Sequence, residues 1–82
     1  MNKIWHTNKT QPNATNEFEI LIIWKNGNVS VDMPNLDEWN KLYLVEEGGY
    51  WKDIKENILY WQYIEKLFKN ELELIRRNYG HK

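Results

Sequence analysis

The chain has 82 residues and a net charge of −1. This length suits a single domain spanning residues 1–82, and the charge argues against a protein that holds duplex nucleic acid on a basic surface. Cysteine is absent, so disulfides and thiolate zinc sites are excluded. Five Trp, five Tyr and two Phe are more rings than so small an interior is expected to hold, which places some of them at the surface.

The apolar segments of the chain are short. The longest apolar run, residues 20–24, is far too short to span a bilayer. The first residues also lack the basic and apolar pattern of a secretory signal. We therefore expect a cytoplasmic protein without membrane contact.

A β-hairpin is expected over residues 17–33. Apolar residues alternate with period two on both sides of Asn26-Gly27: Phe18, Ile20, Ile22, Trp24, Val29, Val31 and Met33. Asn26-Gly27 predicts a type I′ turn, since both residues tolerate the positive φ angles that this turn needs. Pro34 lacks an amide N–H and should end the second strand. Residues 7–16 are polar and predict a loop, and residues 1–6 could add a short strand.

The middle of the chain predicts a short helix and a loop. Asn35 followed by Glu38 resembles a helix cap. Four residues within 35–45 then recur at helical spacing and favour a helix of two turns: Leu36, Trp39, Leu42 and Tyr43. Gly48-Gly49 predicts a mobile loop after it.

Residues 53–79 allow two interpretations. Asp53 and Glu56 resemble a capping box, and apolar residues spaced from Ile54 to Tyr79 fit one long amphipathic helix. Residues 57–64 are nevertheless dense in strand formers with both faces apolar. We favour a strand over 57–64 followed by an amphipathic helix over 65–79. The fold expected is α+β: a small antiparallel sheet, made of hairpin 17–33 and strand 57–64, packed by a C-terminal amphipathic helix 65–79.

The order of these landmarks resembles a group of short phage and prophage proteins of unknown function. The resemblance covers residues 4–67 and rests on Trp5-His6, Pro12, the strand before Asn26-Gly27, and Trp61-Gln62-Tyr63-Ile64. It implies a closing strand over the last of these segments. It also implies a viral accessory protein in the host cytoplasm, often one that counters host defence. The chain departs from the group by its helix 65–79 and by the segments around Trp39 and Gly48-Gly49.

The residue types needed for catalysis are not brought together by the sequence. His6 and His81 are the only imidazoles and lie at opposite ends of the chain, whereas a metal site needs several ligands at fixed spacing. The acidic pairs are neighbours in polar segments rather than carboxyls in contrasting environments. No phosphate-binding glycine motif is present. We therefore expect a protein that is not an enzyme and that holds no metal and no cofactor.

The aromatic residues suggest binding instead. Rings with nearby cations can stack a base and pair with a phosphate. The candidate ligand-binding residues are Tyr50, Trp51, Lys52, Tyr60, Trp61, Tyr63, Arg76 and Arg77. The alternative is that the rings are core and that the two arginines balance the dipole at a helix C-terminus.

Two functions are compatible with these residues. In the first, the protein sequesters a nucleotide-derived immune signal in an aromatic and basic pocket between the subunits of a homo-oligomer. In the second, exposed Trp and Tyr side chains dock on a host defence enzyme and inhibit it.

Overall fold

The structure is a computed structural model, and it describes residues 4–15 and 17–65 of the chain. Over these residues it contains two antiparallel sheets and one short helix, an arrangement compatible with the α+β class. Beyond Glu65, the expected helix 65–79 lies outside the described residues, and so do Arg76 and Arg77.

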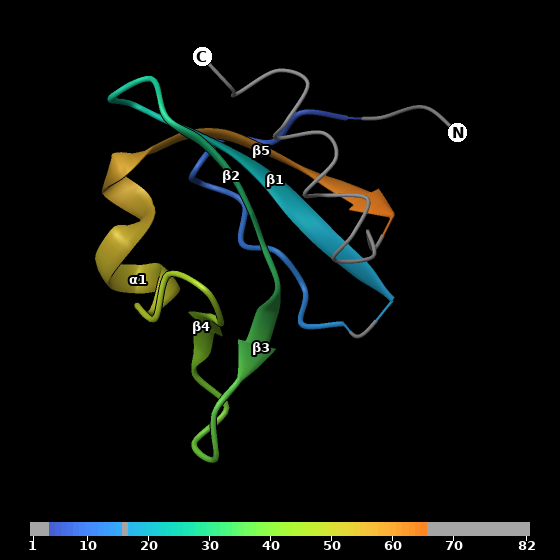
Figure 1. The fold of residues 1–82 in the computed structure, drawn as a ribbon. Helices are drawn as coiled ribbons and strands as arrows, with labels where there is room; N and C mark the ends of the chain where they lie inside the picture. The colour runs from blue at the N-terminus through green and yellow to red at the C-terminus, as the bar shows by residue number, and fades with distance from the viewer. Residues whose placement is uncertain (1–3, 16, 66–82) are drawn as a thin grey trace.

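The main sheet has three strands in the order β2-β1-β5 (Figure 1). They are β1 (Phe18–Trp24), β2 (Val29–Asp32) and β5 (Ile58–Glu65), and both pairings are antiparallel. The hairpin expected over residues 17–33 is confirmed. The strand expected over 57–64 is confirmed too, and the long helix considered for this region is wrong, because Ile58 and Trp61 are both needed in the core beside β1.

The turn between β1 and β2 differs from the type I′ turn expected. Among the described residues, only Asn40 and the glycines 27 and 48 have positive φ, so Asn26 does not. The Gly27 N–H donates to the Trp24 carbonyl, and the Trp24 N–H donates to the Asn28 carbonyl. Residues 25–27 therefore form a three-residue connection that ends on a glycine with a φ of 92°, a common hairpin turn in which only the last residue is left-handed.

A second hairpin replaces the helix expected over residues 35–45. Strands β3 (Pro34–Leu36) and β4 (Leu42–Leu44) pair antiparallel as a two-stranded sheet. The helix prediction is wrong because two members of the apolar stripe, Leu36 and Trp39, are exposed, whereas Leu42 and Leu44 are buried with period-two spacing. A two-turn helix is not stable without a buried face.

The helix of the described region follows the second hairpin. It consists of α1 (Trp51–Ile54), continued by a 3₁₀ turn, η1 (Lys55–Asn57). The capping box expected at Asp53 is wrong, because the helix starts just after Tyr50 and no side chain caps it. The preceding Gly48-Gly49 loop is tied to β4, with the Gly48 N–H donating to the Leu44 carbonyl and the Leu44 N–H to the Gly49 carbonyl. The helix contacts β4 and lies with it below the main sheet (Figure 1).

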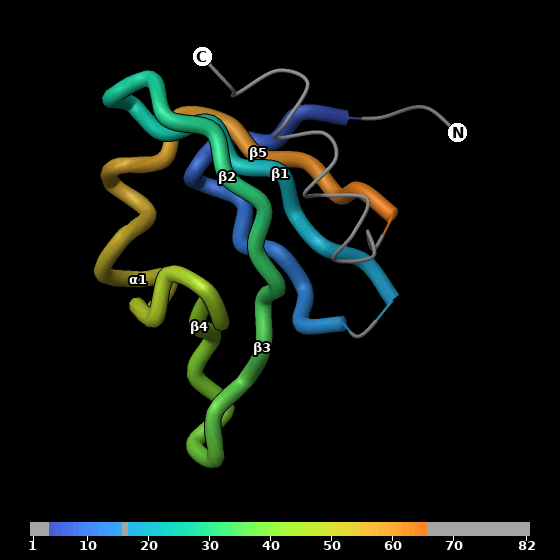
Figure 2. Tube along the Cα trace, viewed as in Figure 1, coloured from blue at the N-terminus to red at the C-terminus, as the bar shows by residue number. Residues whose placement is uncertain are grey.

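The core lies between the sheet and this lower unit, and the N-terminal segment helps to close it. The buried apolar residues are Ile20, Ile22, Leu42, Leu44, Trp51, Ile58 and Trp61. The N-terminal segment follows β5 before turning back (Figure 2), with His6 bridging to Trp61 in antiparallel fashion. The Trp61 Nε1–H donates to the carbonyls of Thr7 and Thr10. The Trp5-His6 and Trp61-Gln62-Tyr63-Ile64 landmarks of the sequence therefore meet at one buried indole.

No helix within residues 4–15 and 17–65 is both long enough and apolar enough to cross a membrane.

Candidate functional site

Two of the predicted ligand-binding rings belong to the core. Trp61 is 0% exposed and Trp51 is 3% exposed, and their rings meet edge-on with centroids 6.2 Å apart. His6 stacks on Trp61 at a centroid distance of 4.4 Å. Both indoles belong to the core of seven apolar residues, which depends on its two largest side chains for its buried area, so neither ring presents an open face on which a ligand could stack.

Tyr60 and Tyr63 lie apart from each other on β5, and the Tyr63 ring meets the Trp61 ring edge-on at a centroid distance of 4.9 Å. Tyr60 is 43% exposed, and its ring meets Trp5 edge-on. Tyr63 is half-buried, and its hydroxyl oxygen accepts a hydrogen bond from the Asn13 amide at 2.8 Å. It lines an apolar pocket of about 460 Å³ with Phe18 and Thr15. The strand thus distributes the predicted aromatic residues over two faces of the sheet.

One pocket does bring together predicted residues. Tyr50, Trp51 and Lys52 line a pocket of about 200 Å³, together with four residues that were not predicted: Gln11, Asn40, Lys41 and Leu42. With Trp51 itself buried, the groups left for a ligand are two ammonium groups, the Tyr50 ring and two side-chain carboxamides. We call this the lysine pocket. Lys41 and Asn40 were missed because the segment that carries them was expected to be helical.

Tyr50 is held in the lysine pocket by Asp37. Its hydroxyl donates to Asp37 Oδ2 at 2.7 Å. This hydrogen bond, assisted by partial desolvation, raises the pKa of Tyr50 above its ordinary value. Desolvation also acts to raise the pKa of Asp37, but hydrogen bonds from the Lys41 amide, the Tyr50 hydroxyl and the Trp39 amide outweigh it, so the pKa of Asp37 lies below its ordinary value.

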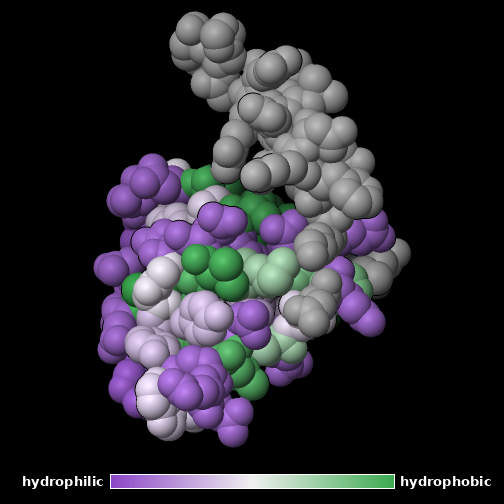
Figure 3. Space-filling view, turned by 60° about the horizontal axis from the view of Figure 1, so that its bottom comes forward, coloured by the Kyte–Doolittle hydropathy of each residue, from purple (hydrophilic) through white to green (hydrophobic). Residues whose placement is uncertain are grey.

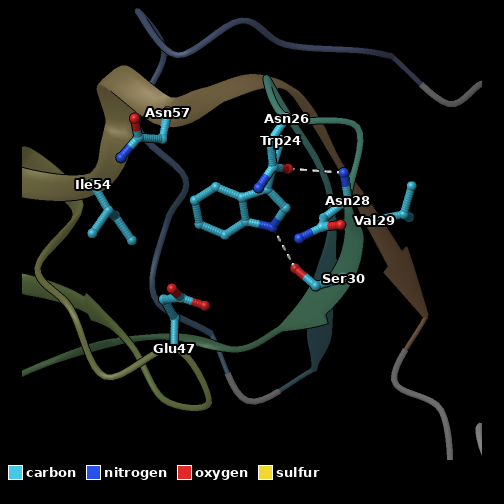
Figure 4. Close-up of a pocket in the computed structure, with 8 residues that line it drawn as sticks. All are labelled: Trp24, Asn26, Asn28, Val29, Ser30, Glu47, Ile54 and Asn57. Carbon is cyan, nitrogen blue, oxygen red and sulfur yellow. Dashed lines mark hydrogen bonds between the residues drawn. The ribbon is translucent and has the colours of Figure 1, made fainter.

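A second pocket, of about 420 Å³, was not anticipated from the sequence. Figure 4 shows the Trp24 indole between two walls, one made by the β1–β2 turn and one by residues from the loop before α1, from α1 and from η1. We call it the Trp24 pocket. Its lining residues are Trp24, Asn26, Asn28, Val29, Ser30, Glu47, Ile54 and Asn57.

Hydrogen bonds fix the walls of the Trp24 pocket. The Trp24 Nε1–H donates to Ser30 Oγ at 2.8 Å, and Asn26 Oδ1 accepts the Asn28 amide at 2.9 Å (Figure 4). The Lys25 N–H donates to the Asn57 carbonyl at 2.8 Å, which ties the turn to η1. The pocket is therefore pre-formed rather than assembled by a ligand.

Buried Asp32 positions the remaining wall. Its side chain is 2% exposed. Oδ1 accepts the amides of Met33 and Glu46, each at 2.8 Å, and Oδ2 accepts the Glu47 amide at 2.9 Å. This carboxylate thus holds the loop that carries Glu47 against the end of β2. No local pattern marks Glu47 or Asn57 as neighbours of Trp24, since they lie 23 and 33 positions further along the chain.

Both pockets offer charged and hydrogen-bonding side chains to a ligand. Among residues 4–15 and 17–65, no group of three or more His, Cys, Asp or Glu side chains could hold a metal ion. Figure 3 shows hydrophilic side chains over much of one face, with apolar side chains in several separate areas between them. No family model, no curated protein and no solved structure matches this chain.

Proposed function

We propose that this chain is a non-enzymatic phage accessory protein that sequesters a nucleotide-derived small-molecule immune signal. The observation that carries the proposal is the lysine pocket, where Lys41 and Lys52 lie with the Tyr50 ring in one concavity. Ammonium groups pair with phosphate oxygens, and the carboxamides of Gln11 and Asn40 can hydrogen-bond to ribose or base edges.

The size of the lysine pocket supports a shared site. Its 200 Å³ lies below the lower bound of about 300 Å³ that small-molecule sites usually have. The pocket therefore suits the phosphate end of a nucleotide, with a second copy of the chain covering the rest. The proposed active form is a homo-oligomer in which each subunit supplies part of the site.

Calorimetry tests this proposal. The intact chain is titrated with a panel of cyclic and ADP-ribose-type nucleotides, and at least one should bind with a Kd below about 100 µM, the weak limit for a useful sponge. The Lys41→Ala/Lys52→Ala double variant should bind that nucleotide at least about tenfold more weakly, since charge-assisted phosphate contacts are lost.

The matched control is Lys9→Ala/Lys25→Ala, which removes the same charge from two exposed lysines outside the pocket and should retain binding. Absence of heat with every nucleotide, or equal weakening in both double variants, contradicts the proposal.

We also propose that the amphipathic helix expected over 65–79 begins after Glu65, the last residue of β5, and covers the outer face of the main sheet. Leu21, Ile23 and Tyr60 of that face are only partly buried. The segment supplies a matching apolar stripe at helical spacing: Phe68, Leu72, Ile75 and Tyr79. Leu72→Lys should then lower the free energy of unfolding far more than Leu74→Lys, which lies off the stripe. Equal effects would exclude this packing.

A second candidate function is inhibition of a host protein by docking. It is favoured by Trp39, which is 70% exposed in the turn between β3 and β4, near Leu36 at 44%. An exposed indole is a typical interface anchor. A stoichiometric host protein that co-purifies with the chain, and is lost on Trp39→Ser, would favour this function over the first.

A further inference from the structure

The Trp24 pocket shares no lining residue with the lysine pocket, and its charged lining side chain is acidic rather than basic. We propose that it is a second binding site, which takes an organic ammonium ion: a substituted ammonium group, such as trimethylammonium, on a compact body. The inference does not depend on the proposed nucleotide function.

The aromatic surface of the pocket is the first argument. The indole N–H of Trp24 is already used by Ser30 Oγ, so the surface left to a ligand is the ring itself. The face of an indole carries negative electrostatic potential and attracts cations more strongly than the faces of Tyr or Phe do. Trp24 is half-buried, and the hydrogen bond to Ser30 fixes its orientation.

The charge of the lining is the second argument. Glu47 is the one charged side chain among the described residues of the lining, which include no Lys, Arg or His. Figure 4 shows it extending from its loop toward the indole. A carboxylate beside an aromatic face attracts a cation by two cooperating interactions. It also repels phosphate, so a nucleotide is not expected here.

The neutral lining residues of the Trp24 pocket also suit an organic ammonium ion. The carboxamides of Asn26, Asn28 and Asn57 offer oxygen acceptors, while Ile54 and Val29 offer apolar contact for methyl groups. The volume of about 420 Å³ falls in the ordinary range for small-ligand sites, about 300–1,000 Å³. Because the hydrogen bond from the Lys25 N–H to the Asn57 carbonyl already joins the turn to η1, little ordering cost remains for binding.

The charge requirement can be tested on the intact chain with choline and with 3,3-dimethyl-1-butanol, which has the same shape without the charge. The readout is the Nε1–H signal of Trp24 in a ¹H–¹⁵N correlation spectrum, assigned by its loss in Trp24→Phe. Choline should shift this signal saturably, and the neutral alcohol should bind at least about tenfold more weakly. No shift with choline up to about 10 mM, or equal binding of the alcohol, would overturn the proposal.

A matched pair of variants tests the role of Glu47. Both Glu46 and Glu47 are exposed, and only Glu47 lines the pocket. Glu47→Gln should weaken choline binding about tenfold, whereas Glu46→Gln, with the same loss of charge one residue away, should change it less than about twofold. Equal weakening by both variants would overturn the assignment. Both substitutions leave the backbone amides that donate to Asp32 in place.

The same assay identifies the source of the ammonium group and separates the two proposals. A free small molecule is favoured if choline binds more tightly than Nα-acetyl-trimethyllysine amide, and a protein side chain is favoured by the reverse order. The Lys41→Ala/Lys52→Ala variant should retain choline binding whether or not nucleotides bind to the wild-type chain. Loss of choline binding in that variant would contradict the independence of the two pockets.

Discussion

At the scale of single residues, two carboxylates organise the loops that form the pockets. Asp32 is buried and accepts backbone amides from Met33, Glu46 and Glu47. Asp37 accepts the amides of Trp39 and Lys41 and the hydroxyl of Tyr50. Each pocket therefore depends on an acidic residue that does not line it. Acidic residues of this kind are positioning groups, and nothing local in the sequence separates them from acidic residues at the surface.

Removal of the Asp32 carboxylate should be strongly destabilising. Asp32→Ala leaves three amides without an acceptor, and we expect a loss of about 2–4 kcal/mol in the free energy of unfolding. The measurement is urea unfolding followed by tryptophan fluorescence. Asp53→Ala, at an exposed position of α1, is the control and should change stability by less than about 0.5 kcal/mol. Similar losses in the two variants would show that Asp32 does not anchor the loop.

The Tyr50–Asp37 hydrogen bond should make stability depend on pH at both ends of the range. The pKa of Tyr50 is raised in the folded state, so its contribution is complete below the unfolded tyrosine pKa of about 10 and is lost as pH rises through the folded pKa. The pKa of Asp37 is lowered, so its contribution is complete above the unfolded value of about 3.9 and is lost as pH falls through the folded pKa.

Unfolding midpoints measured across the pH range test both the predicted alkaline decline and the predicted acid decline in stability. Tyr50→Phe should flatten the alkaline decline, and Asp37→Asn should flatten the acid decline. Phenolate absorbance should show one tyrosine that titrates later than free tyrosine, and this late transition should vanish in Tyr50→Phe but persist in Tyr60→Phe. An unchanged alkaline decline in Tyr50→Phe would contradict the assignment.

At the scale of elements, both hairpins close with the same kind of turn. In the second hairpin, the Asp37 N–H donates to the Lys41 carbonyl and the Asn40 N–H donates to the Asp37 carbonyl. Asn40, with a φ of 61°, occupies the position that Gly27 holds in the first hairpin. Asn is the residue other than Gly that best tolerates this conformation. Asn40 thus stabilises the turn of the second hairpin, although the apolar spacing over residues 35–45 favours a helix.

Substitution at Asn40 tests the second turn. Asn40→Ala should lower the free energy of unfolding by about 1 kcal/mol, because a left-handed backbone is costly for residues with a Cβ and no local hydrogen bond. Asn40→Gly should be neutral or stabilising by comparison. Thermal unfolding of the two variants shows which of them is more stable. A more stable Ala variant would indicate that the turn adopts another conformation.

At the scale of the whole molecule, the aromatic residues divide between the core and the surface. Trp51 and Trp61 supply the core, whereas Trp39, Trp5 and Tyr60 remain substantially exposed. The rings of Trp5 and Tyr60 meet edge-on, whereas Trp39 lies in the turn between β3 and β4, so these exposed rings do not form the single binding site that the sequence suggested. The two polar pockets have clearer ligand chemistry than the exposed rings.

The proposed homo-oligomer rests on the small size of the lysine pocket. We expect native mass spectrometry of the full chain to give the mass of a dimer or higher oligomer, and denaturation to release a small molecule if cargo is retained. Dilution should dissociate the oligomer and weaken nucleotide binding together. A single-chain mass at all concentrations, with full nucleotide affinity, would contradict a site shared between subunits.

The local sequence determined the hairpin over 17–33, because its alternating apolar residues can be buried in one way only, and it favoured the strand over 57–64 through its density of strand formers. It also predicted Tyr50 and Lys52 as ligand-binding residues, and both line the lysine pocket. Only the tertiary structure decided the second hairpin, the burial of Trp51 and Trp61, and the Trp24 pocket. These depend on contacts between residues far apart in the chain, such as Asp32 with Glu47 and Lys25 with Asn57, and no local pattern encodes which distant groups will share an environment.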